Sequence, residues 1–262
     1  MKKPTIFAFT DCKDPNALTR LTARLSTLFA DSSIYSVGID SDIGASGCIL
    51  DTLDALRIGK SPHIIIGNLA PRQDKSHKNG APFYIGRIDQ TIIVATKTCF
   101  TLLSKFNLIK NIEETDVATV CRKFLPREEA NRIANSQFRS FEYVPRLARW
   151  AYEGKKFPTI ASAVVPLGDN QIWWIDNFGN AKTTITEKEI KAAVKNGSVS
   201  LRIAGKTHSF PFYQKLSDVP KGKKAVIIGS SGYKDTRFAE IVIQGKSASS
   251  ALALVHGTLI SF

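Results

Sequence analysis

Two carboxylates stand directly after the first apolar segment of the chain. Residues 5–10 form a β-branched and aromatic run, which predicts a buried strand, and Asp11 and Asp14 follow it. In open α/β sheets, ligands bind at the carboxyl ends of the strands. A carboxylate placed there can accept hydrogen bonds from a ligand. An aspartate after a strand also builds turns and helix caps, so both roles remain open.

Two further segments, both in the C-terminal half, combine polar side chains with glycine. One surrounds Gly179 and the other precedes and includes Gly232. The first can bind a ligand through its carboxylate and amide groups, or it can simply form an Asx-type turn. The second offers hydroxyl and amide N–H groups, and its structural alternative is an ordinary hairpin turn. The candidate residues are Asp176, Phe178, Asn180, Ser230 and Ser231.

A polar loop at 71–80 contains Arg72, Asp74 and His77, three residue types that can activate water. A solvated loop without a catalytic role would have the same composition. His208 and His256 are isolated, and the four cysteines have no CxxC spacing, so the sequence predicts no metal site. The sequence also lacks the glycine-rich nucleotide-binding motifs and the G-x-S-x-G motif of serine hydrolases.

The N-terminal residues alternate between helical and strand patterns. This alternation predicts a three-layer αβα domain with a largely parallel sheet, and we place that domain at residues 1–157. The expected strands after the first are 34–39, 63–67, 83–85 and 92–95, and the expected helices are 16–30 and 46–58.

Short β-like segments dominate from Pro158 onward. They predict a small β-barrel or sandwich domain at residues 158–262, with one helix at 187–195. The expected strands are 172–175, 199–203, 225–228, 240–243 and 252–255.

The global composition is that of a globular protein with one unusual value, a formal net charge of +13. Such a charge can indicate a nucleic-acid partner, but the basic residues are scattered and no nucleic-acid-binding motif accompanies them. No apolar stretch reaches the ~20 residues of a membrane span and no signal peptide is apparent, so we expect a cytoplasmic protein.

Three motifs in order along the chain resemble one enzyme family. The segment Asp176-Asn177-Phe178-Gly179-Asn180 is similar to the D-x-F-G-N motif of the S-adenosylmethionine hydroxide adenosyltransferases, whose fold the fluorinating and chlorinating halogenases share. Thr10-Asp11 and Asp14-Pro15 match the N-terminal motifs of that family. Gly229-Ser230-Ser231-Gly232, followed by Glu240, matches its G-S-S-G motif near the C-terminus.

The resemblance implies a role for each candidate. Asp11 would accept the two ribose hydroxyls of a nucleoside ligand, and Asp14 and Asp176 would accept its ammonium group. Asn180 would pair with the adenine edge, and Ser230 to Gly232 would bind the amino-acid carboxylate. The ligand would be S-adenosylmethionine, with no separate cofactor. The family also implies a homotrimer whose sites form between subunits.

The water-activating residues of the family are not retained. Family hydrolases carry V-D-P-G-V-G, a following arginine and F-H-G-R-D, whereas this chain has Gly67-Asn68-Leu69-Ala70-Pro71 at the first segment. At the second segment, Phe138 or Arg139 occupies the histidine position. Three functions therefore remain open: hydrolysis of S-adenosylmethionine to adenosine and methionine, binding by a catalytically silent relative, and a basic nucleic-acid adaptor.

Overall fold

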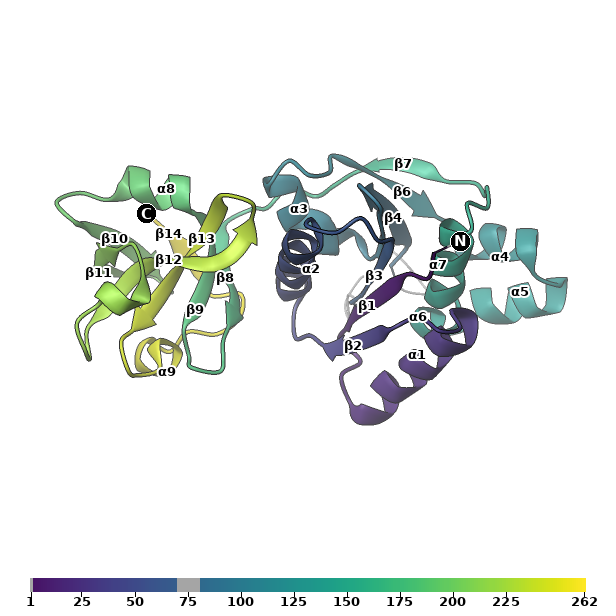
Figure 1. Ribbon diagram of the computed structural model, residues 1–262, viewed down its shortest axis with the longest axis horizontal. Coiled ribbons are helices and arrows are strands. Elements are labelled where there is room, and N and C mark those ends of the chain that lie inside the picture. Colours follow the sequence, from purple (N-terminus) through teal and green to yellow (C-terminus); the bar gives the residue numbers. More distant parts are fainter. Residues whose placement is uncertain (1, 70–80) are drawn as a thin grey trace. The chain divides into compact units, whose positions relative to one another are not determined.

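The five predicted N-terminal strands and two further strands, at 111–115 and 160–163, build one seven-stranded sheet in the computed structural model, which describes residues 2–69 and 81–262 (Figure 1). The strand order is β2-β1-β3-β5-β4-β6-β7, and strands β2, β1, β3 and β5 run parallel. The strands are β1 (Thr5–Thr10), β2 (Ile34–Gly38), β3 (His63–Asn68), β4 (Phe83–Ile88), β5 (Thr91–Ala95), β6 (Asn111–Thr115) and β7 (Ile160–Ala163).

The direction of the sheet reverses at β4. Asp89 and Gln90 alone separate β4 from β5, and Asp89 adopts a positive φ of 49°. A two-residue link can close an antiparallel hairpin, whereas a parallel crossover requires a dozen or more residues. Strands β6 and β7 continue the antiparallel pairing. The sheet is therefore rich in parallel pairs but not wholly parallel.

Helices cover both faces of this sheet, which confirms the predicted three-layer αβα architecture. Figure 1 shows α1 and α7 on one side of the sheet and α2 and α3 on the other. Ile64 and Ile66 of β3 share a core with Leu147 of α7, and the alternation of a strand turns the buried Ile65 to the opposite face. The helices are α1 (Pro15–Leu28), α2 (Asp42–Leu56), α3 (Thr101–Lys105), α4 (Val117–Phe124), α5 (Arg127–Ala134), α6 (Arg139–Glu142) and α7 (Val144–Tyr152), with a 3₁₀ turn at Lys97–Phe100.

The C-terminal strands form a closed barrel, which confirms the predicted β domain. Its order is β10-β11-β12-β13-β9-β8-β14. Inward-facing side chains such as Ile172, Leu201, Phe210 and Ile241 fill its core. The strands are β8 (Asn170–Ile175), β9 (Ala181–Thr186), β10 (Ser198–Ile203), β11 (Lys206–Tyr213), β12 (Lys224–Tyr233), β13 (Thr236–Ile243) and β14 (Leu259–Ser261).

Two helices and a 3₁₀ turn at Leu216–Asp218 accompany the barrel. Helix α8 (Glu187–Ala193) begins with a capping box in which Thr186 and Glu189 bond each other's backbone N–H groups. The strand expected at 252–255 is wrong, because α9 (Ala248–Leu252) occupies the start of that segment and Ala253 ends the helix in the left-handed region. A short apolar run fits a helix as well as a strand, and here Leu252 ends a helix while Leu254 and Val255 lie outside regular elements.

The chain divides into two compact units. One comprises Met1–Ile49 and Arg57–Pro166, and the other comprises Leu50–Leu56 and Leu167–Phe262. Within the described residues, no helix combines the length and apolarity needed to span a membrane.

Candidate functional site

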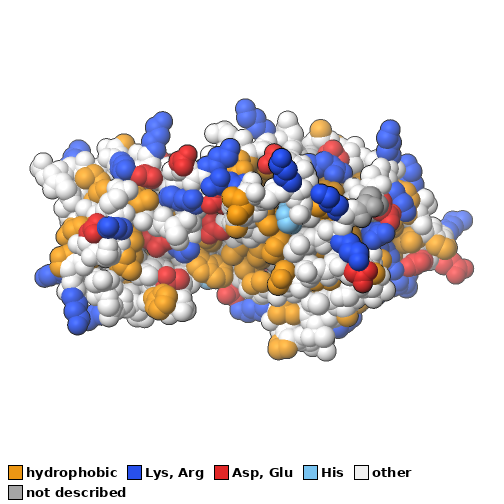
Figure 2. Space-filling view, viewed as in Figure 1, with side chains coloured by type: hydrophobic (Ala, Val, Ile, Leu, Met, Phe, Trp, Pro, Cys, Tyr) orange, Lys and Arg blue, Asp and Glu red, His pale blue; other side chains and the backbone are white. Residues whose placement is uncertain are grey.

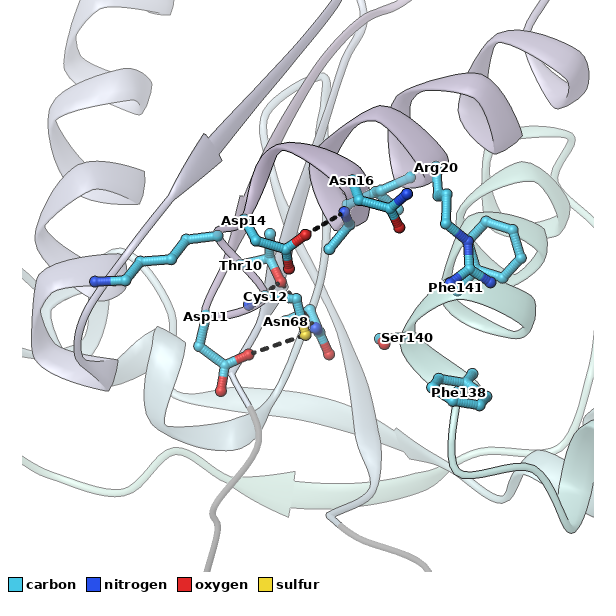
Figure 3. Close-up of a pocket in the computed structure, with 13 residues that line it drawn as sticks. Thr10, Asp11, Cys12, Asp14, Asn16, Arg20, Asn68, Phe138, Ser140 and Phe141 are labelled. Atoms are coloured by element: carbon cyan, nitrogen blue, oxygen red, sulfur yellow. Dashed lines mark hydrogen bonds between the residues drawn. The ribbon is translucent and has the colours of Figure 1, made fainter.

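A hydrogen-bonded junction holds the carboxyl ends of β1 and β3 together. Thr10 Oγ1 accepts bonds from Asn68 Nδ2 at 3.0 Å and from the Cys12 N–H at 3.1 Å, as Figure 3 shows. The Asp11 N–H donates to the Asn68 carbonyl at 3.1 Å. Because Thr10 and Asn68 are both buried, these bonds form in a setting where an unpaired polar group would be costly. The junction therefore fixes the backbone that carries Asp11.

Asp14 caps helix α1. Its Oδ1 accepts the Ala17 N–H at 3.0 Å from an extended backbone conformation, and Pro15 opens the helix. The capping role that the sequence allowed for an aspartate at this strand end thus falls to Asp14. Asp11 and Asp14 both line the cavity that opens at the end of β1.

That cavity has a volume of about 560 Å³. Asp11, Asp14 and Asn68 line one side, and Figure 3 shows the α6 segment and Arg20 facing them. The complete lining is Thr10, Asp11, Cys12, Lys13, Asp14, Asn16, Ala17, Arg20, Leu21, Asn68, Phe138, Ser140 and Phe141.

Phe138 projects into the cavity where the family resemblance places a histidine. Its side chain is 60% exposed and lines the cavity wall, while Arg139 is not among the lining residues. The Arg139 guanidinium instead donates to the Ala81 carbonyl at 3.5 Å, and burial lowers its pKa. The cavity therefore presents a phenyl ring, which cannot take a proton, at the position of the expected base.

Cys12 is the one thiol that lines this cavity among the described residues, and its Sγ lies 3.8 Å from Asp11 Oδ1. Burial and the neighbouring Asp11 carboxylate raise the pKa of the Cys12 thiol. Since the thiolate is the nucleophilic form, this environment keeps Cys12 protonated and unreactive at neutral pH.

The Asp176 carboxylate organises the turn between β8 and β9. Its Oδ1 accepts the N–H groups of Phe178 and Asn180, and its Oδ2 accepts Asn180 Nδ2, each at 2.9 Å. Gly179 has a φ of 81°, and a Cβ there would lie 2.1 Å from Ser247 Oγ. The Asx-type turn allowed by the sequence is therefore present, and glycine is required within it.

This turn presents two candidate residues to a second cavity of about 540 Å³. Phe178 is 73% exposed and Asn180 is buried, and both line it, whereas Asp176 does not. The other lining residues are Leu216, Ile243, Gln244, Gly245, Lys246 and Ser247.

Ser230, Ser231 and Gly232 lie in strand β12 rather than at the tip of a hairpin. The pairing of β12 with β13 shifts register between Ile228 and Gly232, and the hairpin closes later, next to Lys234. Ser231 is 3% exposed, and its hydroxyl accepts a bond from Lys182 Nζ. Of these candidates, Ser230 is the exposed one.

Behind this strand lies a buried carboxyl that the motif comparison does not explain. A Cβ on Gly229 would lie 2.1 Å from Glu240 Oε1, so the glycine makes room for that side chain. Burial raises the pKa of the Glu240 carboxyl, while the nearby Lys182 opposes the shift. In this chain, packing therefore couples Gly229 to Glu240.

Sequence reasoning missed several residues that the structure brings into play. Arg20, Phe141 and Asn68 line the first cavity, and in the barrel Lys182 lies near the buried Glu240 carboxyl. For Arg20 a signal existed, because Ala17, Arg20 and Leu21 have the i, i+3, i+4 spacing of one helix face.

Arg72, Asp74 and His77 lie outside the described residues. The described part of the chain contains no group of side chains that could hold a metal ion.

Comparison with known proteins agrees with this architecture. Residues 170–261 match the model of the SAM hydroxide adenosyltransferase C-terminal domain. The C-terminal domain belongs to that family. The match spans β8 to β14 and contains Asp176, Phe178, Asn180 and Ser230, so the resemblance carried by these residues is confirmed.

Two solved structures share the fold of the whole chain. An uncharacterized conserved protein from Thermotoga maritima superposes with a TM-score of 0.70 at 16% identity, and the alignment covers 98% of each chain. A conserved hypothetical protein from Thermus thermophilus gives 0.62 at 15% identity, again over 98% of both chains. No curated protein matches the chain. These two structures show that the whole chain shares a known fold, whereas the family match itself covers residues 170–261.

Proposed function

We propose that the protein binds an S-adenosylmethionine-type nucleoside with Asp11 on the ribose hydroxyls. The observation that carries the proposal is the position of Asp11 at the end of β1. Asp14 satisfies the first turn of α1, and Asp11 lines a 560 Å³ cavity at the carboxyl end of a central parallel strand. A carboxylate in that place can accept hydrogen bonds from both vicinal hydroxyls of a ribose. The family of the C-terminal domain supports the ligand class.

Cleavage of the ligand is the second candidate. In that reaction water attacks the ribose C5′, the C5′–S bond breaks, methionine leaves as a neutral thioether, and the attacking water loses a proton to give adenosine. A general base or an oriented, desolvated water speeds such a step. Phe138 cannot act as that base, so the described wall of the cavity favours binding over rapid hydrolysis. The loop bearing Arg72, Asp74 and His77 is our candidate source of a substitute set.

A single assay separates these two functions. Purified protein is incubated with S-adenosylmethionine, and adenosine and methionine are followed chromatographically, while calorimetry measures binding. Binding without products supports a silent relative, and equimolar adenosine and methionine above the protein-free control support hydrolysis. The triple variant R72A/D74A/H77A then tests the loop, because turnover that survives all three changes removes the substitute set.

The barrel cavity suggests how the site is completed. We propose that Phe178 and Asn180 receive the adenine, the phenyl ring stacking on the base and the amide pairing with its edge. In the homotrimer implied by the family resemblance, this cavity would face the Asp11 cavity of a neighbouring subunit. The substitution N180A should then weaken adenosine binding while the protein remains folded and assembled. Unchanged affinity in N180A would exclude this role.

A further inference from the structure

Two guanidinium groups lie over one phenyl ring beside the Asp11 cavity. The Cζ atoms of Arg20 and Arg24, both on α1, lie 4.7 Å and 4.6 Å from the centroid of the Phe141 ring. Cation–π attraction at these distances holds a guanidinium over the ring. Of the two arginines, Arg20 lines the cavity.

The two arginines differ in their ionic partners. Arg24 lies 3.6 Å from Glu142, which Arg132 and Arg146 also contact. Lys13, the other basic residue of the cavity lining, pairs with Asp40. Throughout residues 2–69 and 81–262, no carboxylate pairs with Arg20. A guanidinium can still donate through its N–H groups, and their planar fork matches the two oxygens of a carboxylate or a phosphate.

The cavity is therefore chemically polarised. Figure 3 shows Asp11 and Asp14 on one side and Arg20, Phe138 and Phe141 on the other. The first side suits hydroxyl groups, and the second suits an anion attached to an apolar or planar segment. One ligand that satisfies both sides must carry both kinds of group.

Part of the anion site expected from the family resemblance is already engaged in bonds within the barrel. That resemblance places the ligand carboxylate at Ser230 to Gly232, but Ser231 is buried and already accepts a bond from Lys182. Arg20, by contrast, lines the same cavity as Asp11 and has no carboxylate partner among the described residues.

We propose that Arg20 binds an anionic group, a carboxylate or a phosphate, of a nucleoside whose ribose lies on Asp11. Phe138 packs against the part of the ligand that joins the ribose to the anionic group. This inference rests on the proposed nucleoside binding and adds a specificity-determining residue to it. It predicts that an anionic nucleoside binds more tightly than adenosine.

Calorimetry with three ligands tests the inference. Adenosine carries no anion, S-adenosylhomocysteine carries a carboxylate, and adenosine 5′-monophosphate carries a phosphate. In R20Q, affinity for at least one of the two anionic ligands should fall about tenfold to a hundredfold, the loss expected for a hydrogen-bonded charged group. Affinity for adenosine should stay within about twofold. The anionic ligand whose affinity falls further in R20Q identifies the anion that Arg20 binds.

The matched control is R24Q, because Arg24 lies over the same ring but does not line the cavity, and it should leave all three affinities unchanged. R20K, which keeps the charge and loses the fork, should fall between wild type and R20Q. Equal losses for adenosine and the anionic ligands in R20Q, or no loss for any, would overturn the inference. If D11N weakens adenosine while R20Q has no effect, the proposed function stands and the role of Arg20 fails. If no ligand binds the wild type, both fail.

Discussion

Single atoms decide whether the barrel motif tolerates change. A methyl group on Gly229 would meet Glu240 Oε1 at 2.1 Å and force a buried carboxyl group out of place. We expect G229A to lower the free energy of unfolding by about 1–3 kcal/mol, the usual cost of overpacking. Urea denaturation measures it. Gly168 is the matched control, because a Cβ there meets nothing within 4 Å. G168A should stay within ~0.5 kcal/mol of wild type, and equal losses in both variants would contradict the packing argument.

Glu240 also predicts a pH dependence. Burial raises the pKa of its carboxyl above the ordinary 4.5, so the folded state holds a proton that the unfolded state has released. Stability from this group is therefore complete below about pH 4.5 and falls as pH rises toward the raised pKa. Glutamine at this position cannot titrate. As pH rises from about 4 to about 7, the unfolding free energy of wild type should therefore fall relative to that of E240Q. A constant difference would show that the pKa of Glu240 is the same in the folded and the unfolded protein, which would contradict the raised pKa.

The residues of the cavity were predictable only in part. Asp11 and Asp14 follow a strong strand pattern and could be placed at its end from sequence. The contact of Arg20 with Phe141 could not, because it depends on how α1 packs beside α6, and short-range patterns carry no information about such long-range contacts.

At the scale of elements, helix α1 depends on its cap. The substitution D14A removes the acceptor of the Ala17 N–H and should lower the free energy of unfolding by about 0.5–2 kcal/mol. Serine can accept the same bond, so D14S should retain most of that stability. Chemical denaturation of both variants measures the effect. A loss in D14S as large as that in D14A would show that Asp14 stabilises the protein through something other than capping.

Most elements were predictable because their periodicity is strong. The β1–α1–β2 unit and helix α8 agree with the sequence patterns to within a few residues. The strand prediction for 252–255 failed because Leu252, Leu254 and Val255 fit a strand as well as a helix end. Its buried Leu254 joins the barrel core, so tertiary packing decides the outcome.

At the scale of the whole molecule, the net charge bears on how the oligomeric state should respond to salt. Figure 2 shows Lys and Arg side chains scattered over the visible face with Asp and Glu among them, although the net charge is +13. Light scattering should give about three times the chain mass of 28.8 kDa, as the family resemblance implies. The mass should not change with salt if packing holds the trimer together. Association driven by exposed charges alone would weaken as ionic strength rises. A monomer at every salt concentration would contradict the trimer.

The central claim is that Asp11 binds the ribose of a nucleoside, and calorimetric titration with adenosine tests it most directly. The substitution D11N should weaken binding about tenfold to a hundredfold, because hydrogen bonds to a charged acceptor contribute ~1.5–3 kcal/mol. The control is D31N, which removes an exposed carboxylate paired with Lys3 and should bind like wild type. Equal affinity in D11N and wild type, or no binding at millimolar adenosine, would contradict the account.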